Sequence, residues 1–354
     1  MVFRWRAANR LLRVIPIPIF VAWALSFFSP VPLRAQNSEK YYINVNGSLR
    51  TFVVHLPLGY DPKDKYPLVI VLHTADETGQ DMVRLTRFDF VADRYGFITF
   101  YPDSDGAEWD IGIAPAEPKR RGRKGGMAGM GLPIPFPFPK VEKGNGQEGK
   151  SQTGDVPFFE QMLDKLEATY SVDGNRIFAT GYSDGGLMAF RLACSMNGRI
   201  AAFAPVAAAL PRAISTQCKL ARAVPLLMIN GTSDPVVRYR GGSVKDTAVT
   251  TLPVQTTAQN WAGLDQCTLK PSHTTVASRD KTGMPILVDT YGGCREGSEV
   301  TLYTVEGGGN TWPSGNEVRP VKQFGKTSMD LDASEIIWKF FSAHPMQPVP
   351  SAVN

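Results

Sequence analysis

The sequence predicts an α/β protein in which a mostly parallel central sheet is covered by helices on both faces. Short apolar runs such as YPLVIVLH (66–73) are typical of strands that are buried on both faces. These runs alternate with segments whose apolar residues recur at helical spacing. Strand–helix alternation of this kind is typical of parallel sheets.

The strands are expected in six places along the chain. INVNGSLRTFVVHLP (43–57) predicts a hairpin, because Asn46-Gly47 supplies the residues that a tight turn needs. The other expected strands are YPLVIVLH (66–73), FITFYPD (97–103), RIFATG (176–181), VPLLMING (224–231) and VTLYTVEGG (300–308).

Two amphipathic helices are the clearest helical signals. In DVPFFEQMLDKLEATY (155–170) the apolar residues keep helical spacing, Asp155 is expected as the N-cap, and Pro157 fits the first turn. In DASEIIWKFFSAH (332–344) Asp332 and Glu335 have the spacing of a capping box.

The first 35 residues have the pattern of a secretory signal peptide. A start rich in arginine precedes an apolar run over residues 19–28, which is too short to span a bilayer. We therefore expect a signal peptide over residues 1–35 and one mature domain over residues 36–354. The protein would be secreted, extracellular or periplasmic, without stable membrane insertion. The alternative is an uncleaved N-terminal anchor.

The charge balance changes when this segment is set aside. The full chain has 38 Lys and Arg and 33 Asp and Glu, and five of the arginines lie within residues 1–35 with no acidic residue. The remainder therefore has 33 basic and 33 acidic residues, which gives no reason to expect nucleic-acid binding. No CxxC motif or Cys/His cluster with metal-ligand spacing occurs, so we expect no metal and no cofactor.

All four cysteines lie in the C-terminal half, and an even number in an exported chain suggests disulfides. Four cysteines allow three pairings. Pairing of neighbours along the chain would join Cys194 to Cys218 and Cys267 to Cys294.

Residues 115–150 interrupt the strand–helix pattern with a Gly-, Pro- and Lys/Arg-rich insert. Leu132, Ile134, Phe136 and Phe138 each precede a proline, which favours an extended backbone. The insert is expected to be either a flexible surface loop or a lid with an apolar tip.

The hexamer GYSDGG (181–186) carries the clearest chemical signal. It fits the pattern G-x-S-x-G directly after a buried strand and directly before a helix, which is the context that the motif requires. Ser183 is therefore the candidate nucleophile. The N–H groups at the start of the next helix, beginning with Asp184, are expected to stabilise an oxyanion.

Three other loops follow strands where partners of Ser183 are needed. LHTAD (72–76) is expected to supply a second oxyanion N–H, at Thr74. NGTSDPVV (230–237) places Asp234 where an acid would orient a base, and GGGNTWP (307–313) follows the last strand, where the base itself should lie. The order Ser183, Asp234, position 310 is that of α/β-hydrolases.

With these motifs, the sequence resembles secreted esterases of the poly(3-hydroxybutyrate) depolymerase and feruloyl/acetylxylan esterase group, which have the α/β-hydrolase fold. The matching stretches run from about residue 40 to 342, outside the insert, and include YPLVIVLH, RIFATGYSDGGLMAFRLAC, IAAFAPVAAALP, NGTSDPVV, WAGLDQC and YTVEGGGNTWP. The resemblance implies that Ser183 is the nucleophile and Asp234 the triad acid. It also implies that Trp312 belongs to the cleft wall and that Cys267 and Cys294 form a disulfide.

The chain departs from this family at the base. Such proteins usually read GGGHTWP, so Asn310 stands where the resemblance places the catalytic histidine. An amide has no lone pair that titrates near neutral pH, and a serine hydroxyl is a poor nucleophile without a base. The strand before Thr74 also usually ends in His-Gly, whereas His73 is followed here by a residue with a Cβ.

Two classes of function therefore stay open. The first is a serine esterase that cleaves a polyester or acyl and feruloyl esters through an acyl-enzyme, with activity impaired at Asn310. The second is a non-catalytic protein that binds a polymer or acyl ligand in the retained cleft. His73 is a candidate substitute base, and the charge of Asp184 is a second one. Tyr182, His73 and Trp312 are the expected substrate contacts, and the sequence does not predict the oligomeric state.

Overall fold

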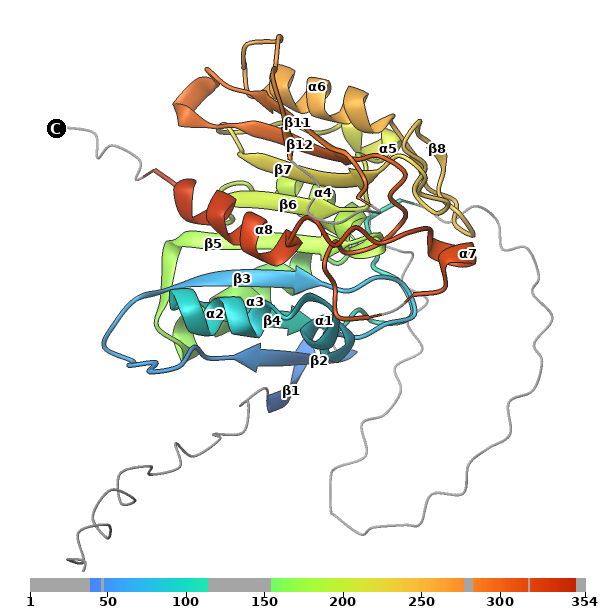
Figure 1. Ribbon diagram of the computed structural model, residues 1–354. Helices are drawn as coiled ribbons and strands as arrows, with labels where there is room; N and C mark the ends of the chain where they lie inside the picture. The colour runs from blue at the N-terminus through green and yellow to red at the C-terminus, as the bar shows by residue number, and fades with distance from the viewer. Residues whose placement is uncertain (1–38, 46–47, 114–153, 277–282, 318, 348–354) are drawn as a thin grey trace, which may run out of the picture. The chain divides into compact units, whose positions relative to one another are not determined.

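A ten-stranded mixed sheet forms the centre of the fold (Figure 1). The computed structural model describes residues 39–45, 48–113, 154–276, 283–317 and 319–347, all within one compact unit that spans residues 38–354. The strand order is β1-β2-β4-β3-β5-β6-β7-β12-β11-β10. Six neighbouring strands are parallel: β4 (Ile98–Pro102), β3 (Tyr66–Leu72), β5 (Val172–Tyr182), β6 (Ala202–Val206), β7 (Leu226–Gly231) and β12 (Val300–Val305).

Antiparallel strands extend the sheet at both edges. β1 (Glu39–Val45) pairs with β2 (Ser48–His55), as the sequence pattern 43–57 indicates, although the turn residues 46–47 lie outside the described part of the chain. At the other edge are β11 (Ile286–Tyr291) and β10 (Ser272–Val276). These two strands were not predicted, and β10 is mostly exposed, so it lacks the apolar run that marks a buried strand.

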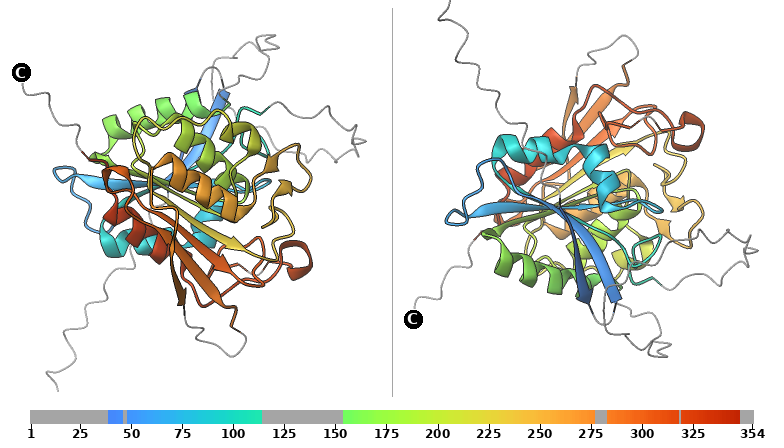
Figure 2. Two further views of the ribbon diagram at one scale, coloured as in Figure 1. Left: turned by 90° about the horizontal axis from the view of Figure 1, so that it is seen from above. Right: turned by 90° about the horizontal axis from the view of Figure 1, so that it is seen from below.

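Helices cover both faces of the sheet (Figure 2). One face carries α1 (Gly79–Thr86), α2 (Phe88–Tyr95) and α8 (Ala333–Ala343), and the other carries α3 (Val156–Thr169), α4 (Asp184–Ser195) and α6 (Val254–Leu264). The smaller elements are α5 (Arg212–Ser215), α7 (Val321–Phe324), the 3₁₀ turn Arg295–Gly297, and the short pair β8 (Gly242–Ser243) and β9 (Thr250–Thr251). The predicted α/β class, with a mostly parallel sheet between two helical layers, is confirmed.

The starts of the two predicted helices differ in detail from the sequence expectation. Asp155 occupies the N-cap position of α3, but its carboxylate accepts no capping hydrogen bond. It binds Arg50 Nη1 at 2.9 Å and the backbone N–H of Asp110 at 2.9 Å instead. At α8 the Asp332 carboxylate does accept from the backbone N–H of Glu335, whose own side chain binds Arg94 and Tyr95. Tertiary partners have replaced part of each predicted cap.

The parallel arrangement places four loops together at the C-terminal ends of the parallel strands. β3, β5, β7 and β12 run in the same direction, so the segments that follow Leu72, Tyr182, Gly231 and Val305 emerge together (Figure 1). These segments contain Thr74, Ser183, Asp234 and Asn310. Across the described residues, no helix is long and apolar enough to cross a membrane. The predicted signal peptide (1–35) and insert (115–150) fall outside the described residues.

Candidate active site

Ser183 occupies a sharp turn between β5 and α4. Its backbone has φ 53° and ψ −107°, a conformation that L-residues rarely adopt, and its N–H donates to the carbonyl oxygen of Val206 at 2.9 Å. A backbone held in such a conformation at the end of a strand is typical of a functional turn. The residue is 4% exposed.

The two motif glycines allow this turn to form. A Cβ on Gly181 would lie 2.3 Å from the carbonyl oxygen of Gly185, and a Cβ on Gly185 would lie 2.3 Å from the carbonyl oxygen of Leu72. Only glycine fits such approaches. The N-terminus of α4 therefore packs directly against the end of β3, beside Ser183.

Ser183 opens on a cavity of about 410 Å³. Thr74 and Asp184, the expected sources of the two oxyanion N–H groups, line this cavity, and so does Asn310. Thr74 is not among the residues with positive φ, so its Cβ causes no backbone strain where the family pattern has glycine. The remaining lining residues are Ala75, Asp76, Glu77, Glu108, Leu187, Val236, Val244, Lys245, Asp246, Thr247, Arg319, Gln323 and Phe324.

Asn310 is hydrogen-bonded to Asp234. Asn310 Nδ2 donates to Asp234 Oδ2 at 2.8 Å and to the carbonyl oxygen of Ala207 at 3.4 Å. The other carboxylate oxygen, Oδ1, accepts from the backbone N–H groups of Val236 and Val237 at 2.7 and 2.8 Å. Asn310 thus gives Asp234 the partner that a triad acid needs, but it brings no titratable base to the cavity.

Burial governs the electrostatics of Asp234. The residue is 6% exposed, and desolvation raises the pKa of Asp234 to about 6 even though Asn310 and the two backbone N–H groups favour the ionised form. A neutral amide partner compensates for less of the desolvation than an imidazolium would. The acid is therefore held in place but incompletely stabilised as an anion.

The backbone of residue 310 is fixed on both sides. The Tyr182 hydroxyl donates to the carbonyl oxygen of Asn310 at 2.7 Å, and the N–H of Asn310 donates to the carbonyl oxygen of Phe324 at 2.6 Å. Tyr182 is fully buried. It holds the loop after β12 in position and does not line the cavity, in contrast to the expected substrate contact.

Trp312 also differs from its expected role. It is 1% exposed, packs edge-on against Phe88, and donates from Nε1 to Ser334 Oγ at 3.2 Å. These partners belong to α2 and α8, so the ring lies in the core on that face of the sheet. Trp312 does not line the cavity that contains Ser183, and the expectation of a cleft-wall residue is not met.

His73 is held as a structural residue. It is fully buried; Nδ1 lies 2.7 Å from the carbonyl oxygen of Thr74, and Nε2 accepts the backbone N–H of Ser104 at 2.9 Å. Burial lowers the pKa of His73, which favours the neutral ring. Because both nitrogens are occupied and the ring does not line the cavity, His73 is neither placed to accept a proton from Ser183 nor placed to contact substrate.

The other three histidines lie elsewhere. His55, the last residue of β2, binds Asp93. His273 on the exposed strand β10 binds Asp289 of β11, and His344 follows α8. None of the four histidines of the chain, all of which are within the described residues, lines the cavity.

Sequence reasoning missed one ion-pair cluster in the cavity wall. Arg319 Nη2 binds Glu77 and Glu317, and the guanidinium lies over the Tyr182 and Phe324 rings at 4.9 and 5.3 Å. Desolvation raises the pKa of Glu77 although Arg319 opposes it. Glu77 follows the LHTAD stretch and could have been noticed there. Arg319 lies in no motif, and only the fold brings it to the cavity.

Two disulfides brace the C-terminal half. Cys194 at the end of α4 is joined to Cys218, and Cys267 after α6 is joined to Cys294. These are the neighbour pairings that the sequence suggested. In the described part of the chain, no group of three or more His, Cys, Asp or Glu side chains is arranged to hold a metal ion.

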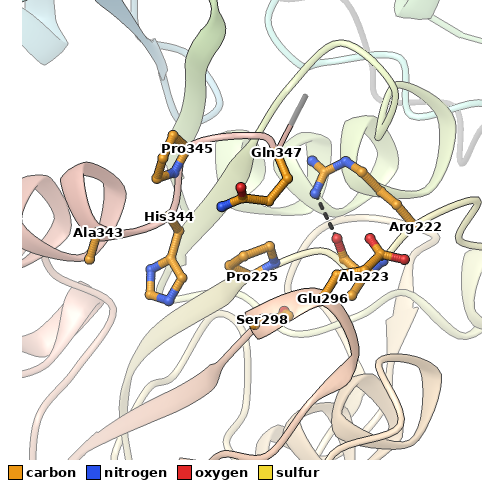
Figure 3. Close-up of a pocket in the computed structure, with 10 residues that line it drawn as sticks. Arg222, Ala223, Pro225, Glu296, Ser298, Ala343, His344, Pro345 and Gln347 are labelled. Carbon is orange, nitrogen blue, oxygen red and sulfur yellow. Dashed lines mark hydrogen bonds between the residues drawn. The ribbon is translucent and has the colours of Figure 1, made fainter. Parts of the chain in front are cut away.

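A smaller hollow of about 60 Å³ lies at the opposite edge of the sheet, where β7 and β12 begin (Figure 3). Arg222 is its most prominent polar side chain. Its guanidinium donates to four backbone carbonyl oxygens, those of Asn197, Ile200, Ala201 and Ala223, at 2.6 to 2.7 Å. The arginine therefore ties loops together, and these backbone contacts use four of its five N–H donors.

Two family models match parts of the chain. Residues 50–112 match the family described as esterase PHB depolymerase, and residues 126–268 match the family described as phospholipase/carboxylesterase. Feruloyl esterase B from Piromyces equi is 33% identical over 44% of this chain, but the chain spans only 28% of that longer protein.

A second relative is matched over most of its length. A probable feruloyl esterase C from Aspergillus clavatus is 30% identical over 62% of this chain and 70% of its own length. Among solved structures, an acetyl xylan esterase from Aspergillus awamori is 14% identical with a TM-score of 0.48, over 77% of this chain and 94% of that chain. The chain belongs to the α/β-hydrolase family of carboxylic ester hydrolases that contains esterases of the PHB depolymerase and feruloyl esterase type.

Proposed function

We propose that the protein is an exported serine ester hydrolase that works through an acyl-enzyme at Ser183, with turnover limited by the amide at position 310. The observation that carries the proposal is the strained Ser183 turn at the start of α4, opening on a cavity of about 410 Å³. A cavity of several hundred Å³ is within the range of small-molecule sites. Ser183 Oγ would attack the ester carbonyl, and the N–H groups of Thr74 and Asp184 would stabilise the oxyanion.

The missing base sets the expected rate. General base catalysis contributes on the order of 10² to 10⁴ in rate, and Asn310 cannot supply it. The oxyanion N–H groups and the cavity remain, and together such features leave roughly 10³ to 10⁴ over the reaction in water. Slow Ser183-dependent cleavage of reactive esters is therefore expected.

The substrate class that we propose is a neutral acyl or feruloyl ester, free or on a polymer. Both curated relatives compared above carry the name feruloyl esterase. The acyl group would occupy the cavity beside Leu187 and Phe324, which are apolar residues of its wall. Two disulfides and the arginine-rich leader support export to an oxidising compartment.

The test compares three purified proteins on p-nitrophenyl acetate and p-nitrophenyl butyrate: wild type, Ser183→Ala and Asn310→His. We expect the wild-type rate to exceed that of Ser183→Ala. We expect Asn310→His to raise kcat by about 10² or more, because Asp234 already holds the hydrogen bond that would orient the imidazole. Intact-mass spectra should show an acetyl adduct of about 42 Da on wild type, and none on Ser183→Ala, when acylation is faster than deacylation.

The second candidate is a non-catalytic binder of an acyl or polymeric ligand. It is favoured by the complete burial of Asn310 and by the hydrogen bonds at its amide nitrogen, which make residue 310 a stable structural element. A wild-type rate equal to that of Ser183→Ala, together with a gain of activity in Asn310→His, would support this candidate and refute catalysis by the natural chain.

A further inference from the structure

The cavity beside Ser183 needs a proton acceptor, and its carboxylates are the groups that remain. The histidines do not reach it, and Asn310 does not titrate. Asp234 does not line the cavity, because it lies behind Asn310 and accepts three hydrogen bonds there. Five acidic residues do line it: Asp76, Glu77, Glu108, Asp184 and Asp246.

Four of these five are poorly suited to the role. Asp76, Glu108 and Asp246 are exposed, so bulk water competes with a buried hydroxyl for their carboxylate oxygens. Glu77 is engaged by Arg319. Burial raises the pKa of Glu77 overall, but accepting a proton would cost Glu77 its ion pair with Arg319.

Asp184 is placed differently. It follows Ser183 directly as the first residue of α4, and it is partly buried in the wall of the same cavity. Its Oδ2 accepts the backbone N–H of Trp109 at 2.9 Å. Trp109 is itself fixed, because its Nε1 donates to the carbonyl oxygen of His73 at 2.9 Å. One oxygen of the carboxylate is therefore anchored, and Oδ1 has no hydrogen bond within the described part of the chain.

We propose that Asp184 is the proton acceptor for Ser183, acting through one bridging water, in place of the histidine that position 310 lacks. This role rests on the ester hydrolase function proposed above. A water is needed because Ser183 lies in the turn before α4, and within the described part of the chain no hydrogen bond joins its hydroxyl directly to the carboxylate of Asp184. A base that acts through one water satisfies the geometric requirement for general base catalysis.

The protonation chemistry of Asp184 suits the role. Burial raises the pKa of Asp184 to about 7, the N–H of Trp109 opposes this, and the charges of Glu108 and Asp155 raise it further. Asp155 is paired with Arg50, whereas the carboxylate of Glu108 is exposed to solvent. Across the cavity lie the carboxylates of Asp76, Glu77 and Asp246 and the cations of Lys245 and Arg319. A group with a pKa near 7 can both take and return a proton at neutral pH.

The steps conserve every proton. In acylation, Ser183 Oγ bonds to the ester carbonyl carbon while its proton passes through the water to Asp184. The protonated carboxyl of Asp184 then returns the proton to the departing alkoxide as the ester C–O bond breaks. In deacylation, a second water bonds to the acyl carbon and gives its proton to Asp184, and Ser183 Oγ leaves with that proton.

The variant Asp184→Asn tests this role while preserving the local structure. Its amide oxygen can still accept the N–H of Trp109, but it cannot accept a proton. The matched control is Asp164→Asn on the exposed surface of α3, outside the cavity. Hydrolysis of p-nitrophenyl acetate would be measured from pH 5 to 9, and the Ser183→Ala rate would be subtracted at each pH to give the Ser183-dependent rate.

We expect the Ser183-dependent rate of wild type to rise through about pH 7, the pKa of Asp184. We expect Asp184→Asn to lower it about 100-fold or more and to abolish the rise, and Asp164→Asn to change neither. The same Asp184→Asn change in an Asn310→His background should have little effect on the rate, because the imidazole then accepts the proton.

The outcomes separate this inference from the proposed function. A wild-type rate equal to Ser183→Ala at every pH would refute the hydrolase function and the role of Asp184 together. A Ser183-dependent rate that Asp184→Asn leaves intact would refute the role of Asp184 alone. An equal loss with and without His at position 310 would also refute it, because it would show that Asp184 acts on the oxyanion site or on the cavity wall.

Discussion

Replacing Asp184 by asparagine should stabilise the protein at alkaline pH and change its stability little at acidic pH. Burial raises the pKa of Asp184 from its usual 3.8 to about 7 in the folded state. In the unfolded chain the carboxyl ionises near pH 4. Between these values only the unfolded state releases the proton, so rising pH favours unfolding until the folded state also ionises.

The size of the effect follows from the two pKa values. Each pKa unit corresponds to about 1.4 kcal/mol. The difference between the folded and unfolded pKa of Asp184 therefore lowers the free energy of unfolding by about 4 kcal/mol at pH 8.5 and by about 1 kcal/mol at pH 4.5. Because the side chain is only partly buried, we reduce the expected difference between these two pH values to about 2 kcal/mol. The amide introduced by Asp184→Asn is neutral at both pH values, so the variant avoids this loss.

The measurement is the free energy of unfolding of wild type, Asp184→Asn and the control Asp164→Asn by urea denaturation at pH 4.5 and 8.5. Asp234 and Asp265, whose pKa values are also raised to about 6 by burial, titrate alike in all three proteins and cancel in the comparison. A stabilisation of Asp184→Asn that is the same at both pH values, or a loss of stability at pH 8.5, would refute the reasoning. The predicted gain in stability would accompany a loss of activity, because buried ionisable groups at active sites reduce the stability of the fold.

Two further predictions concern the same edge of the sheet. Free imidazole should raise the Ser183-dependent rate, which is the wild-type rate minus the Ser183→Ala rate at the same imidazole concentration. An azole can donate to the amide oxygen of Asn310 and accept the seryl proton. No dependence of this difference on imidazole concentration would contradict the prediction. Gly185→Ala should lower the free energy of unfolding, measured by urea denaturation, by about 1 to 3 kcal/mol, since its Cβ would lie 2.3 Å from the carbonyl oxygen of Leu72. The control Gly263→Ala has open space around the new Cβ and should be neutral or stabilising.

The sequence could predict the chemistry at the ends of the parallel strands. Thr74, Ser183 and Asn310 follow three different strands, and Asp234 follows a fourth, so the topology alone brings all four to one edge of the sheet. Their assignment required only the strand–turn–helix context of GYSDGG and the order of the strands. The catalytic roles themselves remain predictions that the experiments above address.

The orientation of the neighbouring side chains could not be predicted in the same way. Tyr182, His73 and Trp312 lie within two residues of the candidate site along the chain, yet all three are buried and none lines the cavity. A residue at the end of a strand or in a tight turn faces the core or the cavity according to which helices cover it. Those helices come from distant segments: Ser334 in α8, for example, accepts the hydrogen bond of Trp312.

The anchoring of residue 310 has a consequence for the history of such a protein. The hydroxyl of Tyr182 and the carbonyl of Phe324 hold its main chain, and neither contact depends on which side chain residue 310 carries. Imidazole and amide can therefore replace each other during divergence without refolding of the loop. On the function proposed above, an exchange of His and Asn at this position would change the reaction rate while the surrounding loop keeps its structure.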